Sequence, residues 1–402
     1  MPFTRRTFIT LIVIAGTIIS LCMGLRQSLG LFMRPINLDI GVSAAAFGFS
    51  IALQNIVWGI SQPIIGALAD RFGARPVLVV TGLIFASGFA VMSTSNGALG
   101  LDIGGFLVGI GIAGTGFGVL IGVITRATPP EKRSQMVGLV SAAGSLGTIV
   151  IAPLGQALIE NLGWRLGLGG FTAIALLIAL MSLGVREQSA ATGASAATPQ
   201  PLGAALREAR DHRGFVAMTI AYFACGFQLI FITTHLPQYL EVCGVSPALG
   251  ATALGLIGLF NTVGTYTFGL LGARYSQKRL LALIYLFRTL FIVAFVTLPV
   301  TPTSTLIFAA AMGLLWLGVA PLVTGIVARM FGLGNFNMLF GLSFLSHQLG
   351  SFLGAWMGGL VFDLTGAYTW AWAALVAIGA MAFTLQWTMD DRPIGELRAA
   401  PA

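Results

Sequence analysis

The stretch GALADRFGAR, from Gly66 to Arg75, lies between two long apolar runs and has a degenerate copy, GLLGARYSQK, from Gly269 to Lys278. The two copies are 203 residues apart in the chain, and Arg71 matches Arg274 at this offset. A constant offset without gaps predicts that the chain consists of two related halves. The same offset also pairs Gly41-Val42-Ser43 with Gly244-Val245-Ser246, Leu146-Gly147 with Leu349-Gly350, Gly155 with Gly358, Gly163 with Gly366, and Glu160 with Asp363.

The composition of the 402 residues excludes a soluble globular protein. Hydrophobic residues make up 56% of the chain and charged residues 8%, whereas roughly a quarter of the residues of a soluble domain are charged. Apolar runs of about 20 residues, each long enough to cross a bilayer as a helix, recur along most of the chain. These runs do not alternate as the strands of a membrane barrel do. The sequence therefore predicts an all-α polytopic membrane protein.

The apolar runs predict twelve membrane-spanning helices, six in each half. Because six is an even number, both halves have the same orientation across the bilayer, as in parallel repeats related by an axis along the membrane normal. We expect a six-helix bundle at 1–186, an Ala/Ser/Pro-rich cytoplasmic linker at 187–213 and a second six-helix bundle at 214–402. The expected spans lie at about 8–33, 44–68, 76–95, 100–125, 135–159, 165–185, 214–235, 247–271, 280–299, 304–328, 337–361 and 368–388.

The 21 lysines and arginines give the chain a net charge of +8, but they are scattered singly between the apolar runs. We therefore expect no nucleic-acid partner. Seventeen of them fall on the side of the predicted spans that carries both termini, while Arg34 and Arg165 fall on the opposite side. Because basic residues concentrate in cytoplasmic loops, we expect both termini in the cytoplasm and the protein in the cell inner membrane.

The three cysteines and three histidines of the chain are widely spaced. This spacing predicts no disulfide framework, no metal site, no bound cofactor and no catalytic triad. We therefore expect a protein that is not an enzyme. We also expect a monomer that lies in the lipid bilayer.

The stretch GALADRFGARPV, Gly66 to Val77, resembles the G-x-x-x-D-R-x-G-x-R loop of the major facilitator superfamily. The degenerate second copy and the layout of six plus six spans extend the resemblance over the whole chain. It implies two six-helix bundles that rock around a central site and open alternately to each side. It also implies that this loop forms a cytoplasmic gate, for which the candidate residues are Gly66, Asp70, Arg71, Gly73, Arg75 and Arg274. The simpler interpretation of the arginines is anchoring on the cytoplasmic side.

Two further stretches resemble one branch of that superfamily, the monocarboxylate and oxalate/formate carriers. They are GLRQSLGLFMRPI in the first span, Gly24 to Ile36, and FLSHQLGSFLGAWMGG in the eleventh, Phe344 to Gly359. Members of that branch often carry an anion-binding arginine on span eight. The corresponding stretch here, ALGLIGLFNTVGTYTFGLL at 253–271, has none, so this departure leaves the substrate open.

Two arginines, Arg26 and Arg288, fall inside predicted spans, where a charge costs roughly 2.5–3.5 kcal/mol on insertion scales. The equivalent residues of the other half are Leu229 and Phe85. Because the repeated scaffold does without a cation at these positions, each arginine calls for its own explanation. The resemblance places span one at the central cavity and span nine outside it, so Arg26 is the stronger candidate for binding substrate. Arg288 is a second candidate, with bonding to spans eight or eleven as the structural alternative.

No Asp or Glu falls at mid-depth in any predicted span. A buried guanidinium without a carboxylate partner suits a small organic anion, which it binds through two parallel hydrogen bonds. The alternative is that Arg26 pairs with helix carbonyls or with a polar neighbour. His347, near the middle of span eleven, is a candidate for proton coupling because histidine titrates near neutral pH, or else it bonds neighbouring helices. The remaining substrate-binding candidates are Gln54, Asn55, Tyr222, Gln228, Asn261, Trp316 and Gln348.

The sequence therefore predicts a secondary transporter of a small organic anion, most simply a monocarboxylate, with protons as a candidate coupling ion. Two alternatives stay open at this point. One is drug efflux on the same fold, against which stands the lack of a buried acid that exporters of cationic drugs usually need. The other is a membrane protein that senses a solute or assists assembly without transporting anything.

Overall fold

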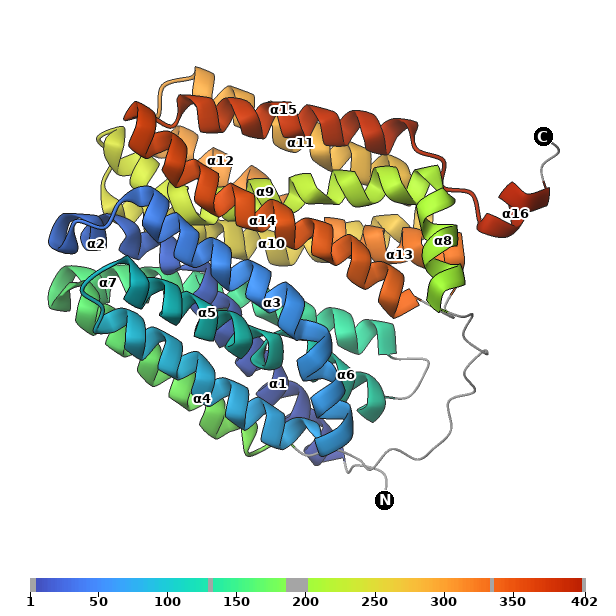
Figure 1. Cartoon of the computed structure of the whole chain (residues 1–402), viewed down its shortest axis with the longest axis horizontal. Helices are drawn as coiled ribbons and strands as arrows, with labels where there is room; N and C mark the ends of the chain where they lie inside the picture. The colour runs from blue at the N-terminus through green and yellow to red at the C-terminus, as the bar shows by residue number, and fades with distance from the viewer. Residues whose placement is uncertain (1–4, 129–132, 186–201, 333–335, 400–402) are drawn as a thin grey trace.

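The computed structural model describes residues 5–128, 133–185, 202–332 and 336–399, and the regular structure within these ranges is entirely helical. Figure 1 shows the helices of the first half, coloured blue to green, beside those of the second half, coloured yellow to red. The predicted fold class is confirmed. The helices and their bounds are α1 (Arg5–Gln27), η1 (Leu29–Phe32), α2 (Met33–Ile40), α3 (Ala44–Phe72), α4 (Ala74–Ser93), α5 (Ala98–Thr115), α6 (Phe117–Ala127), α7 (Arg133–Ser182), α8 (Leu202–Asp211), α9 (Arg213–Val242), α10 (Pro247–Arg274), α11 (Gln277–Thr297), α12 (Pro302–Leu314), α13 (Val319–Phe331), α14 (Phe336–Thr365), α15 (Thr369–Thr388) and α16 (Ile394–Ala399).

All twelve predicted spans are helical. Ten stretches of the described residues are long and apolar enough to cross a membrane. One of these, Leu146–Ser182, covers parts of the fifth and sixth predicted spans, which are joined at Gly163 inside α7. The eleventh predicted span corresponds to α14. Of the predicted linker, residues 187–201 lie outside the described part of the chain, and 202–211 form the short helix α8.

The repeated glycines occupy repeated turns. Gly41 and its equivalent Gly244 have φ values of 67° and 80°, and the Gly163–Gly366 pair has values of 78° and 68°. Residues with a side chain rarely adopt this left-handed conformation, so each pair marks a turn that both halves need between two spans. The shared register of the two halves therefore has a physical cause in the backbone.

The fourth and tenth spans are each divided into two helices. The fourth span divides at Gly116 into α5 and α6, and the tenth divides at 315–318 into α12 and α13. The two breaks lie at nearly equivalent places, because the repeat equivalent of Gly116 is Val319, the residue directly after the break at 315–318. Breaks of this kind free backbone carbonyls that side chains of neighbouring helices must satisfy.

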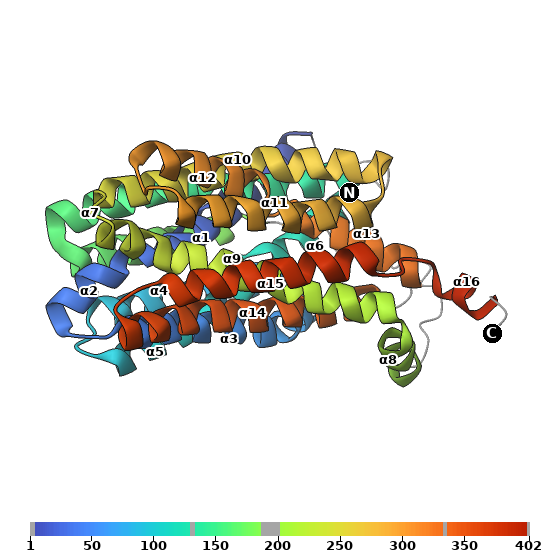
Figure 2. The same ribbon diagram turned by 90° about the horizontal axis from the view of Figure 1, so that it is seen from above.

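The two halves meet along two pairs of helices, α3 with α14 and α7 with α10. Figures 1 and 2 show α8 and α16 at one end of the molecule, which we call the terminal end, and α2 at the other, which we call the distal end. Near the distal end η1 and α2 of the first half lie against α9 of the second. Toward the terminal end, the second pieces of the broken spans, α6 and α13, pack on helices of their own half.

Two polar contacts join the halves at the distal end. The carboxylate of Asp363 on α14 accepts hydrogen bonds from the backbone N–H groups of Ala44 and Ala45, at 3.1 and 2.8 Å, and so caps the start of α3. Arg34 on α2 forms an ion pair with Glu241 on α9, with 2.7 Å between Nε and Oε2. Both contacts must break for the halves to separate at this end.

Candidate functional site

Arg26 lies in the last turn of α1, next to the 3-10 turn η1 that ends the straight part of the first span. Its Nη2 donates a hydrogen bond to Oδ1 of Asn55 on α3 at 2.7 Å. Its guanidinium carbon lies 4.9 Å from the ring centroid of Trp58. Its Nε is buried and has no hydrogen-bond partner among the described residues. Arg26 thus pairs with a polar neighbour, as the structural alternative expected, and still has a buried donor free.

A small pocket surrounds this guanidinium and is lined by both halves of the chain. Its volume is about 10 Å³, room for one water molecule at most. Gln54 reaches it with a buried Oε1 that has no partner within the described part of the chain. An organic anion needs more space, so the pocket must widen before it could hold one. The lining residues are Arg26, Leu29, Gly30, Ile51, Gln54, Asn55, Ile230, Thr233 and Thr234.

His347 and Gln348 lie beside this pocket on α14. The Nδ1 atom of His347 lies 3.1 Å from Oε1 of Gln348, and the Gln348 Nε2 donates to the backbone carbonyl of Asn55 at 2.8 Å. The imidazole lies between the Tyr222 ring, at 4.9 Å, and the Phe344 ring, at 5.7 Å. The predicted residues Arg26, Asn55, Gln348, His347 and Tyr222 are therefore brought together across the two halves.

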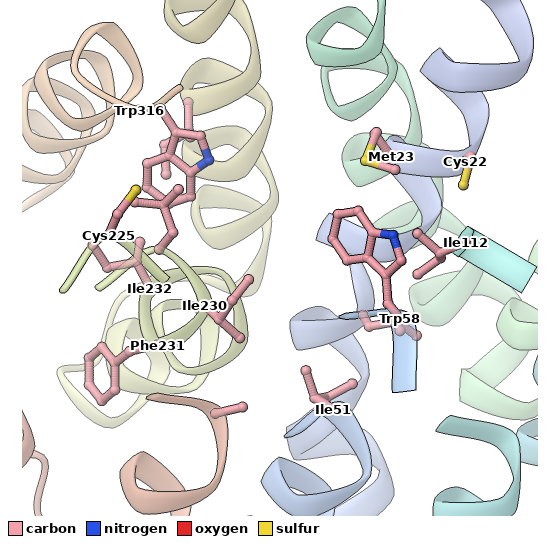
Figure 3. Close-up of a cluster of buried hydrophobic side chains, with 14 of the residues drawn as sticks. Cys22, Met23, Ile51, Trp58, Ile112, Cys225, Ile230, Phe231, Ile232 and Trp316 are labelled. Carbon is pink, nitrogen blue, oxygen red and sulfur yellow. The ribbon is translucent and has the colours of Figure 1, made fainter. Parts of the chain in front are cut away.

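Three other predicted substrate-binding residues do not line this pocket. Gln228 donates from Nε2 to the carbonyl of Leu375 on α15 at 3.1 Å. Asn261 accepts at Oδ1 a hydrogen bond from the backbone N–H of Leu317, inside the break of the tenth span, at 2.9 Å. Trp316 belongs to that same break and is 3% exposed. Figure 3 shows Trp316 near Cys225 on one side of the buried hydrophobic cluster and Trp58 near Met23 on the other.

Arg288 on α11 is fully buried and bonds the broken tenth span. Its Nε and Nη2 donate to the carbonyl of Leu315, at 3.0 and 2.6 Å, and Nη2 also donates to the carbonyl of Trp316. A cation beside the last carbonyls of α12 satisfies them and complements the negative end of that helix. Its observed partners thus lie on span ten, not on spans eight or eleven as the structural alternative expected. Its Nη1 has no partner among the residues described.

Neither buried arginine forms an ion pair with a carboxylate within the described residues. Three described acids form hydrogen bonds near the distal end instead, while Oδ1 of Asp102 on α5 is buried without a partner among the described residues. Asp39 accepts a hydrogen bond from Trp164 Nε1 at 2.9 Å, Glu160 accepts one from Gln156 Nε2 at 2.9 Å, and Asp363 caps α3. The centre of the molecule therefore carries two guanidinium charges without a compensating described carboxylate.

The predicted gate residues lie at the terminal end. Gly73 forms the turn between α3 and α4 with φ of 87°, which explains a glycine at this place in the motif. Arg71 and Arg75 are exposed, and the Arg71 guanidinium lies 5.2 Å from the ring centroid of Phe72. Arg274, the repeat equivalent of Arg71, is exposed at the end of α10, and Gly66 lies on α3. The side chain of Asp70 is outside the described part of the chain.

The site also includes residues that the sequence interpretation missed. Trp58 covers the Arg26 guanidinium and donates from Nε1 to Oε1 of Gln62 at 2.8 Å. Gln62 in turn donates to the carbonyl of Ala113, just before the break in the fourth span, at 3.1 Å. The signal was available, because Gln54, Trp58 and Gln62 are four residues apart and share one face of α3.

Comparisons with known proteins agree with this architecture. The family model described as Major Facilitator Superfamily matches residues 12–331. The chain is 23% identical to the uncharacterized MFS-type transporter YcxA of Bacillus subtilis, over 85% of each chain. It is 27% identical to monocarboxylate transporter 13 of Rattus norvegicus, over 90% of this chain and 83% of that one. A bacterial homolog of the human lysosomal transporter Spinster, solved in an inward-facing and unoccupied conformation, superposes over the full length of both chains with a TM-score of 0.80 and 17% identity. A D-xylose–proton symporter superposes with a TM-score of 0.75 and 16% identity.

Proposed function

The chain belongs to the Major Facilitator Superfamily, and from this premise we propose that it is a secondary transporter of a small organic anion, most simply a monocarboxylate. The observation that carries the proposal is the Arg26 guanidinium, buried in a pocket lined by both halves with Nε unpaired among the described residues. Relatives named as monocarboxylate transporters support the same substrate class at 26–28% identity.

The chemistry of Arg26 favours an anion over other substrates. A guanidinium keeps its charge and binds a planar carboxylate through two parallel hydrogen bonds. Its charge is offset by the Asn55 amide oxygen and the Trp58 ring, both weaker than a counter-ion. A carboxylate that enters from the pocket supplies the missing negative charge. Gln54 and Thr233, which also line the pocket, then contribute polar contacts.

Proton coupling through His347 deepens this proposal. The positive charges of Arg26 and Arg288 both act on the imidazole. An anion bound at Arg26 offsets one of these charges, so the anion and a proton on His347 favour each other's binding. Mutual preference of this kind makes the two move together, and we therefore propose symport of the anion with a proton.

The distribution of contacts between the halves supports an orientation and a conformation for this carrier. The distal end is joined by Arg34–Glu241 and by the Asp363 cap, whereas α6 and α13 pack within their own halves. We place the terminal end in the cytoplasm of the cell and regard the described conformation as open toward it. In transport the halves rock, the distal contacts break, and the Gly66–Arg75 loop with Arg274 closes the terminal end.

Counterflow in liposomes containing the purified protein tests the role of Arg26. We expect Arg26→Ala to abolish accumulation of a labelled monocarboxylate, and Arg26→Lys to keep a small part of it, because lysine retains the charge without the planar pair of donors. Arg279→Ala, an exposed arginine at the start of α11, is the matched control and should transport normally. Normal apparent affinity in Arg26→Ala would contradict the assignment.

A further inference from the structure

A chain of hydrogen bonds runs from His347 to Arg26 and crosses from one half of the molecule to the other. His347 Nδ1 lies 3.1 Å from Gln348 Oε1, Gln348 Nε2 donates to the Asn55 carbonyl at 2.8 Å, and Asn55 Oδ1 accepts from Arg26 Nη2 at 2.7 Å. The central link joins α14 of the second half to α3 of the first. The candidate proton site and the candidate anion site are therefore mechanically connected.

The chemistry of the partners determines the direction of every link. A backbone carbonyl only accepts hydrogen bonds, so Gln348 must present its NH₂ group to Asn55 and its oxygen to His347. That oxygen also only accepts, so the Nδ1 atom of His347 must carry the hydrogen. The Asn55 amide is oriented in the same way, because its Nδ2 donates to the carbonyl of Ile51 at 2.8 Å and its oxygen accepts from Arg26. Turning either amide over would break bonds at both of its ends.

The surroundings hold these groups in place. Gln348 is fully buried and packs over Gly59, where an added Cβ would lie 3.1 Å from Gln348 Cγ. The His347 imidazole is stacked on the Phe344 ring and contacts the Tyr222 ring at a tilt. The titratable and charged groups that face it are Tyr222 from α9 and the guanidinium charges of Arg26 from α1 and Arg288 from α11.

We propose that Gln348 is a positioning residue. Through it, the protonation state of His347 determines the strength of the hydrogen bond from Gln348 Nε2 to the Asn55 carbonyl, which joins the two halves. A protonated imidazole always presents a hydrogen at Nδ1, whereas a neutral one does so in only one of its two tautomers. When that hydrogen is absent, the Gln348 oxygen faces a lone pair, the amide turns, and the bond to the Asn55 carbonyl is lost. Protonation therefore favours the conformation described above. This inference rests on the proposed role of His347 in coupling.

Distance measurements between two spin labels test the inference without substrate. Phe72 at the end of α3 and Tyr275 just after α10 are repeat equivalents, 60% and 64% exposed at the terminal end, and both are replaced by labelled cysteines in a Cys243→Ser background. Burial and the two neighbouring guanidinium charges disfavour a proton on His347, so we expect the long-distance population to grow as the pH falls from about 8 to about 4. Loss of one buried hydrogen bond corresponds to roughly a two- to tenfold change in the population ratio.

Gln348→Leu and Gln348→Glu separate this mechanism from a general structural role. Both variants lack the amide donor to Asn55, so both should lose the pH dependence and lean toward the short-distance population at every pH. His347→Gln should also be insensitive to pH. A Gln348 variant that keeps the full pH response overturns the inference. Absence of any pH response in the unmodified protein overturns it too. Neither result bears on carboxylate binding by Arg26, which the counterflow experiment tests separately.

Discussion

At the scale of single residues, the two buried arginines differ in how completely they are satisfied. Arg288 donates from Nε and Nη2 to two main-chain carbonyls that the break in the tenth span leaves free, and of its nitrogens Nη1 alone lacks a partner among the described residues. Arg26 has one amide oxygen and one aromatic face, its Nε has no partner among the described residues, and its side chain lines a pocket to which both halves contribute. A group that is satisfied by its own fold contributes to stability, whereas one that is incompletely satisfied is available to a ligand.

The sequence showed that both arginines need an explanation, and only the family resemblance ranked Arg26 above Arg288. Each lies in an apolar run, and each has an apolar residue at its repeat equivalent, Leu229 or Phe85. The difference arises from which neighbours have free acceptors, and those neighbours come from α3 and from the break at 315–318, far away in the chain. For the same reason Gln228 was placed in the site, although its amide is directed at α15.

At the scale of elements, the helices were predictable and their breaks were not. Span limits follow from hydropathy, and the turns from glycines such as Gly41 and Gly163 that recur 203 residues later. The stretches around Gly116 and 315–318 are as apolar as the rest of their spans. They break because side chains of neighbouring helices satisfy the freed carbonyls: Gln62 bonds Ala113 and Arg288 bonds Leu315. Hydropathy carries no information about such partners.

The hydrogen bonds from Arg288 to the broken tenth span lead to a prediction about stability. Arg288→Leu leaves the carbonyls of Leu315 and Trp316 without their donors, and an unsatisfied buried group costs about 1–3 kcal/mol. We expect a clearly lower melting temperature, with Arg288→Lys in between, measured by thermal unfolding of the purified protein. Stabilisation by a bound carboxylate should persist in both. Loss of that stabilisation at an unchanged melting temperature would instead assign Arg288 to the substrate.

At the scale of the whole molecule, transport requires the distal contacts to be strong enough to close that end and weak enough to open. Asp363 places a carboxylate at the N-terminus of α3, where the backbone N–H groups and the helix dipole favour negative charge. Its repeat equivalent, Glu160, bonds Gln156 on its own helix instead. The two repeat-equivalent acids therefore act differently: Asp363 joins the halves by capping α3 from α14, whereas Glu160 does not contact the other half through this bond.

Asp363→Asn should shift the molecule toward the conformation that is open at the distal end. Asparagine keeps one acceptor oxygen but lacks the negative charge, which contributes about 0.3–1 kcal/mol at a helix N-terminus and corresponds to roughly a two- to fivefold change in the population ratio. A cysteine at Thr233, in the pocket and 7% exposed, should then react faster with a water-soluble thiol reagent in the Cys243→Ser background. Glu160→Gln is the matched control. Equal reaction rates in the two variants would show that the Asp363 cap does not hold the distal end closed.

The central claim is that Arg26 binds the carboxylate of the substrate, and thermal stabilisation of the purified protein tests it most directly. A ligand of the folded state at a hundredfold excess over its Kd adds about 2.7 kcal/mol. We predict that one or more small monocarboxylates raise the melting temperature, that Arg26→Ala abolishes the rise, and that Arg279→Ala preserves it. Stabilisation by lipophilic cations alone, or a carboxylate effect that survives in Arg26→Ala, would contradict the account.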